Sequence, residues 1–409
     1  DVCSSDLFTL AQTTTVPEFG YAATFVGIVT AWIGFNRGAL GTPLLLMSNF
    51  SRNEVLAESR HAVAGAVLTG VLGAATLAVT GLLTNHLAMA AAFSVVLPGV
   101  LAQDVLRYSA IALGRPQVAA LSDATWAAPM LALLCLNATA AGLSAAVSIG
   151  IWGAAGIICA AMISVMTSAW PRLRGLSVWW RLFPVARVRF GTVQTLNTTA
   201  ATLVTIAVTA FAGAAVTGGL RGASTLFGPI AMLVSALPLV FIPHARRTGQ
   251  PPAQQWRMLT RVSILTSAAT VVLTLFLVLV PEAIGELLLG DTWKPASEVV
   301  VYVGIGNAVA CWMVGILALF QAAGRSREIF YIRNLQVGLQ LAVAIGLAVV
   351  VGSVAAIAIG LMAVNVLSVL AGLALVRRAL TGPGANSTDV VASAGDAALL
   401  RAIRSVHPR

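Results

Sequence analysis

Apolar residues recur in long, nearly uninterrupted runs along almost the whole chain, separated by short polar stretches. Eleven of these windows predict helices, and most are long enough to cross the roughly 30 Å hydrocarbon core of a bilayer. The windows are 21–46, 61–83, 87–112, 117–139, 145–169, 191–214, 223–243, 262–281, 297–320, 335–351 and 354–376. The pattern therefore predicts an all-α, polytopic membrane protein.

The composition supports the same class, because 58% of the residues are hydrophobic and only 9% are charged. A soluble protein of 409 residues would need far more polar surface than this. No nucleic-acid partner is needed to explain the net charge of +10. Arginine-rich connections beside anionic lipid account for it.

The positions of the cations fix an orientation. When the connections are numbered alternately, one set contains all but three of the 24 Lys and Arg residues. This set consists of 51–60, 104–116, 170–190, 244–261, 321–334 and the tail after 376. The three exceptions are Arg37, inside a window, and Arg221 and Lys294 in the other set. Because positive charge concentrates on the cytoplasmic side, we expect the first set to be cytoplasmic.

The first residues do not read as native sequence. Residues 1–7 resemble the in-frame translation of a sequencing adapter, so we exclude them from the analysis of the fold. Residues 8–11 then read as the last turn of a truncated first helix. Restoring that helix gives twelve spans with both native termini in the cytoplasm. The alternative is a natural, short N-terminus on the outer side.

The basic segment 170–190 divides the restored chain into two lobes of six helices. We expect an N-terminal lobe at 8–169, a cytoplasmic linker at 170–190, a C-terminal lobe at 191–378 and a cytoplasmic tail at 379–409. The Trp and Arg residues of the linker suit the headgroup level, or a segment that lies on the inner leaflet. Two lobes are typical of a transporter whose site lies in a central cavity between them.

Ionisable side chains inside the membrane are candidates for function, because burying a charge there is costly. Arg37 lies near the middle of window 21–46, beside Asn36. A guanidinium at this depth is suited to bind a phosphate or pyrophosphate with two hydrogen bonds. The alternative is that Arg37 extends towards the cytoplasmic face or pairs with a carbonyl.

A second candidate group lies in the hairpin between windows 87–112 and 117–139. Asp104 and Arg107 are three residues apart, so they share one helical face and form a predicted pair or gate. Asp123 lies in the next window. It is predicted either to pair with Arg107 or Arg115, or to carry a coupling proton.

Two further residues, Asn197 and Arg221, complete the candidate substrate-binding set, although interhelical hydrogen bonds are the usual role of an asparagine in a span. The sequence offers no Ser/His/Asp arrangement, no Gly-rich phosphate loop with Lys and no acidic metal motif. We therefore expect no enzymatic activity, no bound metal and no cofactor.

Several segments, taken in order, resemble one family of transporters. They are 16–21 (VPEFGY), 36–45 (NRGALGTPLL), 103–108 (QDVLRY) with 114–116 (GRP), 220–223 (LRGA) with 227–229 (FGP), and 289–293 (LGDTW). In these segments the chain is similar to the polysaccharide-biosynthesis and O-antigen flippase-like proteins of the multidrug/oligosaccharidyl-lipid/polysaccharide exporter (MOP) superfamily. The resemblance covers roughly 16–378.

The resemblance implies two six-helix lobes around a central cavity in a multi-pass protein of the cell (plasma or inner) membrane. It implies transport of a polyprenyl-pyrophosphate-linked oligosaccharide from the cytoplasmic to the outer leaflet. The expected partners are this lipid-linked glycan, the bilayer, and the polymerase and glycosyltransferases of surface polysaccharide synthesis. A lipid II flippase, a cation-coupled multidrug exporter and a non-transporting scaffold remain as alternatives.

Overall fold

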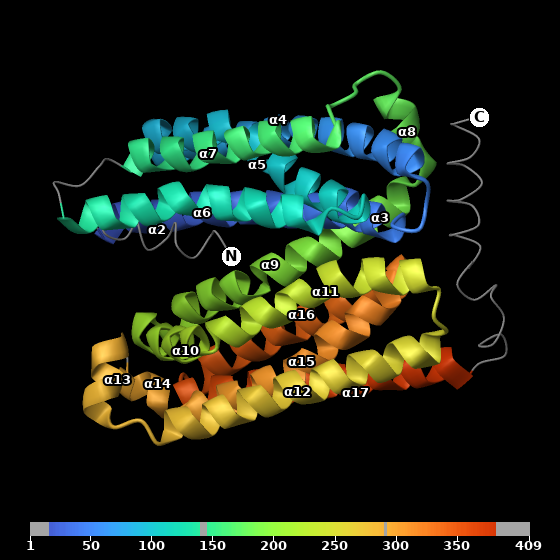
Figure 1. The fold of residues 1–409 in the computed structure, drawn as a ribbon. Helices are drawn as coiled ribbons and strands as arrows, with labels where there is room; N and C mark the ends of the chain where they lie inside the picture. Colours follow the sequence, from blue (N-terminus) through green and yellow to red (C-terminus); the bar gives the residue numbers. More distant parts are fainter. Residues whose placement is uncertain (1–15, 140–144, 290–292, 382–409) are drawn as a thin grey trace. The chain divides into compact units, whose positions relative to one another are not determined.

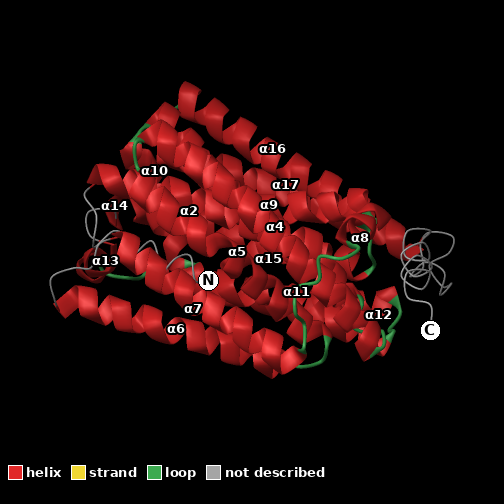
Figure 2. Cartoon of the chain, turned by 90° about the horizontal axis from the view of Figure 1, so that it is seen from above, coloured by secondary structure: helices red, strands yellow, loops and turns green. Residues whose placement is uncertain are grey.

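The computed structural model describes residues 16–139, 145–289 and 293–381, and within these ranges every regular element is a helix (Figure 2). Nine of the described helices are long and apolar enough to cross a membrane, and they coincide with nine of the eleven predicted windows. The windows 21–46 and 117–139 fall on a broken helix and on α6. The predicted all-α membrane fold is confirmed. The predicted first helical turn at 8–11 lies outside the described residues.

The described residues up to Thr199 form the first of two compact units. Its helices are α2 (Val16–Asn36), η1 (Arg37–Gly41), α3 (Thr42–Leu46), α4 (Arg52–Thr84), α5 (Leu87–Ala112), α6 (Pro116–Thr139), α7 (Ala145–Thr167), α8 (Leu176–Leu182) and the first part of α9 (Pro184–Ala212). The central element is α5, which contacts α2, α4, α6 and α7 (Figure 1). Its residues Leu97, Val100 and Leu101 are fully buried.

The described residues from Ala200 onwards form the second unit. It contains the rest of α9, then α10 (Ala214–Leu226), α11 (Gly228–Thr248), α12 (Pro252–Val278), α13 (Glu282–Leu289), α14 (Trp293–Ser297), α15 (Val300–Ala322), α16 (Ser326–Val350) and α17 (Val354–Thr381). Here α15 is the central helix, in contact with α11, α12, α16 and α17. Each unit is therefore built around one helix that its neighbours cover.

Local sequence signals set the ends of the long helices. The α4 helix begins with a capping box, in which the Ser51 hydroxyl accepts from the backbone N–H of Glu54 and the Glu54 carboxylate accepts from the backbone N–H of Ser51. The α11 helix ends at Thr248 and is capped by Gly249, whose φ of 60° is left-handed and favours glycine. Pro252 then opens α12, where a missing N–H costs nothing.

The predicted linker 170–190 is partly helical, because it contains α8 and the first turns of α9. Trp170 is exposed, as the headgroup-level interpretation expects, but Trp179 and Arg187 are each only 3% exposed. The burial of these two side chains within the protein was not predicted, and their depth at the headgroup level stays a prediction. They are buried because a carboxylate on α4 binds both of them.

Candidate functional site

The first predicted span is interrupted at Arg37. There α2 gives way to η1, a single π-helical turn in which the backbone N–H of Thr42 donates to the Arg37 carbonyl. Gly38 makes this turn possible in the packed bundle, since any Cβ at this position would collide with the backbone of Phe190 on α9. Isolated π-helical turns occur frequently at functional sites. The turn places Arg37 against α5.

Four charged side chains form a continuous network at this turn. The Nε of Arg37 donates to both carboxylate oxygens of Asp104, at 3.2 and 3.0 Å, and its Nη2 donates to Oδ1 at 3.0 Å. Arg107 donates from Nη1 to the same Oδ1 at 3.0 Å. Its Nη2 reaches Oδ2 of Asp123 at 2.8 Å. The network thus joins η1, α5 and α6 through side chains alone.

Burial differs sharply along this network. The side chain of Asp104 is 4% exposed, those of Arg37 and Arg107 are 24% and 21% exposed, and that of Asp123 is 41% exposed. Two guanidinium groups face two carboxylates, so the network is neutral as a whole. A buried carboxylate is stable only when its charge is matched and its lone pairs are bonded, and Asp104 meets both conditions. Asp104 is therefore the centre that holds the two arginines together.

The structure confirms two predicted contacts of this hairpin. Asp104 and Arg107 pair along one face of α5, and Asp123 pairs with Arg107 across the hairpin. Arg115, the other predicted partner of Asp123, instead donates to the backbone carbonyl of Met166. Sequence reasoning missed the ion pair of Arg37 with the carboxylate of Asp104.

The other candidate residues lie apart from this network. Asn36 is fully buried; its Nδ2 donates to the carbonyl of Trp32 and its Oδ1 accepts from the hydroxyl of Thr69. Asn197 donates to the side chain of Gln194 within α9. Arg221 belongs to the second unit, where it is exposed on α10. A substrate contact for these three residues stays a prediction.

A second ionic cluster, which the sequence analysis did not find, lies where α4 meets α8 and α9. Glu58 accepts from Nη2 of Arg187 and from the indole N–H of Trp179, both at 2.7 Å. The guanidinium of Arg187 stacks over the Trp179 ring and also donates to the carbonyl of Ala39 in η1. The imidazole of His61 stacks on the indole ring of Trp179.

This second cluster also contacts the π-helical turn, because Arg187 donates to the turn's own backbone at Ala39. The clue in the sequence was the spacing of Glu58 and His61, three residues apart on one face of a helix that enters the membrane. Its partners lie more than 110 residues away along the chain, at Trp179 and Arg187. Their contact could not be inferred from local pattern.

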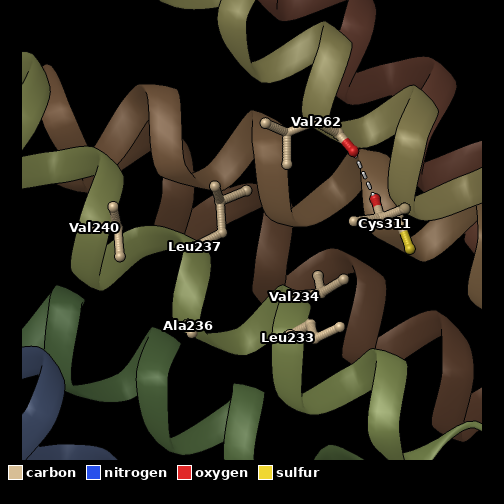
Figure 3. A pocket seen from close by; sticks show the side chains of 8 residues that line it. Leu233, Val234, Ala236, Leu237, Val240, Val262 and Cys311 are labelled. Atoms are coloured by element: carbon tan, nitrogen blue, oxygen red, sulfur yellow. Dashed lines mark hydrogen bonds between the residues drawn. The ribbon is translucent and has the colours of Figure 1, made fainter. Parts of the chain in front are cut away.

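The second unit contains an apolar pocket of about 240 Å³ between α11, α12 and α15 (Figure 3). Its lining residues are Leu233, Val234, Ala236, Leu237, Val240, Val262, Thr266 and Cys311. The hydroxyl of Thr266 donates to the carbonyl of Val262 within α12, so the lining has little polar capacity left. Among the described residues no group of three or more His, Cys, Asp or Glu side chains could hold a metal ion.

The chain matches no protein-family model and no curated protein sequence. Solved structures do resemble it. An outward-facing multidrug-resistance MATE transporter of the MOP superfamily aligns with a TM-score of 0.68 and 12% identity, over 94% of this chain and 89% of that one. A variant of the Vibrio cholerae MATE transporter VcmN aligns with a TM-score of 0.70 and 16% identity, over 94% of each chain.

A MOP-superfamily transporter of Pyrococcus furiosus, described as having a binding pocket of reversed polarity, aligns with a TM-score of 0.71 and 12% identity, over 94% of this chain and 92% of that one. The chain thus has a fold similar to that of MATE and MOP-superfamily transporters. Each of these neighbours is described as a transporter, and at 12–16% identity the likeness to them concerns the fold.

Proposed function

We propose that the protein moves a polyprenyl-pyrophosphate-linked oligosaccharide from the cytoplasmic to the outer leaflet of the cell membrane. The observation that carries this proposal is the distribution of charge among the described membrane helices. Each of Glu58, Asp104 and Asp123 is bound to an arginine. A cationic substrate would therefore find no unmatched carboxylate among these three residues, whereas an anionic substrate meets arginines that can exchange partners.

Arg37 is the residue that we expect to make this exchange. Its Nε and Nη2 donate side by side to the two carboxylate oxygens of Asp104. A guanidinium also binds a phosphate with this geometry. Its side chain is 24% exposed, so a ligand can approach it from solvent. When a pyrophosphate replaces Asp104 as the ligand of Arg37, Asp104 keeps its hydrogen bond to Arg107 and is not left unpaired. Substrate binding would then loosen η1 from α5.

A second candidate function is cation-coupled export of drugs, and one residue favours it. The side chain of Asp123 is 41% exposed and has a single bond to Arg107, so it is the carboxylate of the network that an ion or proton reaches most easily. The MATE neighbours include a multidrug-resistance transporter. The two functions differ in the charge of the substrate, which allows a direct comparison.

The proposal is tested with Arg37→Lys and Arg37→Gln in proteoliposomes, by measuring flux of a fluorescent polyprenyl-pyrophosphate-linked oligosaccharide between leaflets. Lysine keeps the charge beside Asp104 but cannot bind with two parallel hydrogen bonds. We expect at least about a tenfold loss of flux from Arg37→Lys, since each charge-assisted hydrogen bond contributes roughly 1.5–3 kcal/mol.

The matched control is Arg181→Gln, which removes an exposed cation from the end of α8 and should keep normal flux. Thermal unfolding of each variant separates loss of transport from loss of fold. Arg37→Lys that folds normally and transports the glycan at the wild-type rate would contradict the role given to Arg37.

A further inference from the structure

Arg333, in the second unit, differs from the buried arginines of the first unit in its surroundings. The sequence places it in a cytoplasmic connection, but α16 begins at Ser326, so Arg333 lies inside the helix. Among the described residues it has no carboxylate within 4.0 Å, and its Nε makes no hydrogen bond although it is buried. Arg107 and Arg187 also leave Nε unbonded, yet both are neutralised by a carboxylate.

A row of amides extends from Arg333 into the unit. Nη1 of Arg333 donates to Oε1 of Gln336 at 2.7 Å. Gln336 and Gln340 both donate to Oδ1 of Asn365 on α17, at 3.3 and 2.9 Å. Asn365 in turn donates to the carbonyl of Gly306 on α15 at 3.4 Å. The amide orientations are thereby fixed, and the residue of this row that binds Arg333, Gln336, is neutral.

The contact with α17 gives the depth of this group. Asn365 lies 12 and 13 residues before Arg377 and Arg378, which mark the basic end of α17, so the Asn365 layer is roughly 18–20 Å from that end at 1.5 Å per residue. Arg333 precedes Gln336 by three residues on α16, which brings it roughly 4.5 Å closer to the basic end. Along α16 itself, Arg333 lies seven residues after Ser326, roughly 10 Å inside a helix that is long and apolar enough to span a membrane.

The described helices α15 and α17, which pack against α16, supply no counter-charge, because their sequences contain no Asp or Glu. On α16 the one carboxylate is Glu328, five residues before Arg333 and about 140° around the helix. Keeping an unmatched guanidinium at this depth is costly, and such residues are retained where they meet a charged ligand or ion.

We propose that Arg333 is a phosphate-binding residue, and that Gln336, which is itself held by Asn365, positions it to bind an oxyanion of a phosphate or pyrophosphate headgroup. Guanidinium presents a planar fork of donors that matches two phosphate oxygens. Gln336 occupies one N–H of Nη1 and holds the plane of the guanidinium; because Nε is buried, the N–H groups left for a ligand are those of Nη2 and the second N–H of Nη1. The site goes beyond the proposed function by placing phosphate binding in the second unit, and rests on it only for the choice of a polyprenyl probe.

The test is binding to the purified full chain in detergent, measured by calorimetry with three probes: inorganic pyrophosphate, polyprenyl pyrophosphate and phosphatidylglycerol. We expect Arg333→Gln to weaken polyprenyl pyrophosphate binding by at least about tenfold. Arg378→Gln is the matched control, because it removes an exposed arginine from the end of α17 and should leave the affinity unchanged.

The probes separate the possible sources of the phosphate. Arg333-dependent binding of inorganic pyrophosphate as well would show that the headgroup suffices, and competition by phosphatidylglycerol would assign the site to bilayer lipid. Arg333→Lys, which retains the charge, covers the case in which Arg333→Gln does not fold. Wild-type affinity of both variants for all three probes would overturn the proposal. Because no flux is measured, a failure here is distinct from a failure of transport.

Discussion

Replacing Asp104 by Asn should destabilise the first unit strongly, because it removes the charge that two arginines share. The substitution keeps the shape of the side chain but turns one acceptor oxygen into a donor that faces Arg37 and Arg107. Breaking a buried ion pair from one side typically costs about 3–5 kcal/mol. Both arginines are partly exposed, at 24% and 21%, so water can solvate them and the lower end of this range applies.

A loss of about 3 kcal/mol corresponds to a fall in Tm of about 6–12 °C for a unit of this size. The assay is thermal unfolding of the purified protein in detergent, followed by tryptophan fluorescence. Asp123→Asn is the matched control: its side chain is 41% exposed and has one ionic contact, so we expect a loss of about 1 kcal/mol or less. A double-mutant cycle with Arg37→Gln should give a coupling energy of about 1–3 kcal/mol.

One contrary result is that Asp104→Asn unfolds within about 2 °C of the wild type, a shift that corresponds to about 1 kcal/mol or less. The other is that Asp123→Asn is the more damaging of the two. Either result would mean that Asp104 is not the centre of the network.

Two further substitutions test the supports of the π-helical turn. Gly38→Ala should lower stability by about 1–3 kcal/mol, because its Cβ meets the backbone of Phe190. Gly27→Ala places its Cβ in open space and should be neutral or stabilising. Equal Tm values for the two variants would contradict the close approach of Gly38 to Phe190. Glu58→Gln leaves Arg187 buried without its counter-charge and should cost about 3–5 kcal/mol in thermal unfolding, and a wild-type Tm would show that the pair is not needed for folding.

The sequence predicts well what depends on local pattern. The membrane spans follow from runs of apolar residues, and the Asp104–Arg107 pair follows from a spacing of three residues on one helix. Its extension to Asp123 was also foreseen, because a hairpin with a short turn keeps its two helices adjacent. In each case the interacting residues are close in sequence.

Contacts between distant segments were not predictable in the same way. Arg37 and Asp104 are 67 residues apart, and their meeting depends on the rotation of two helices that no local rule fixes. The π-helical turn depends on the approach of Gly38 to α9, which the sequence of the turn does not reveal. Arg333 was placed in a connection because the apolar run begins after it, whereas α16 starts at Ser326.

We propose that the transported substrate is an anionic lipid-linked glycan, and the decisive measurement compares the flux of such a glycan lipid with that of a cationic drug-like dye. Proteoliposomes containing the native protein would be assayed in parallel for flux of a fluorescent polyprenyl-pyrophosphate-linked oligosaccharide and of a cationic dye, with and without a proton or sodium gradient. We predict glycan-lipid flux well above that of empty liposomes and no gradient-dependent movement of the dye. Gradient-driven dye transport without glycan-lipid flux would contradict the claim and assign the protein to cation-coupled drug export.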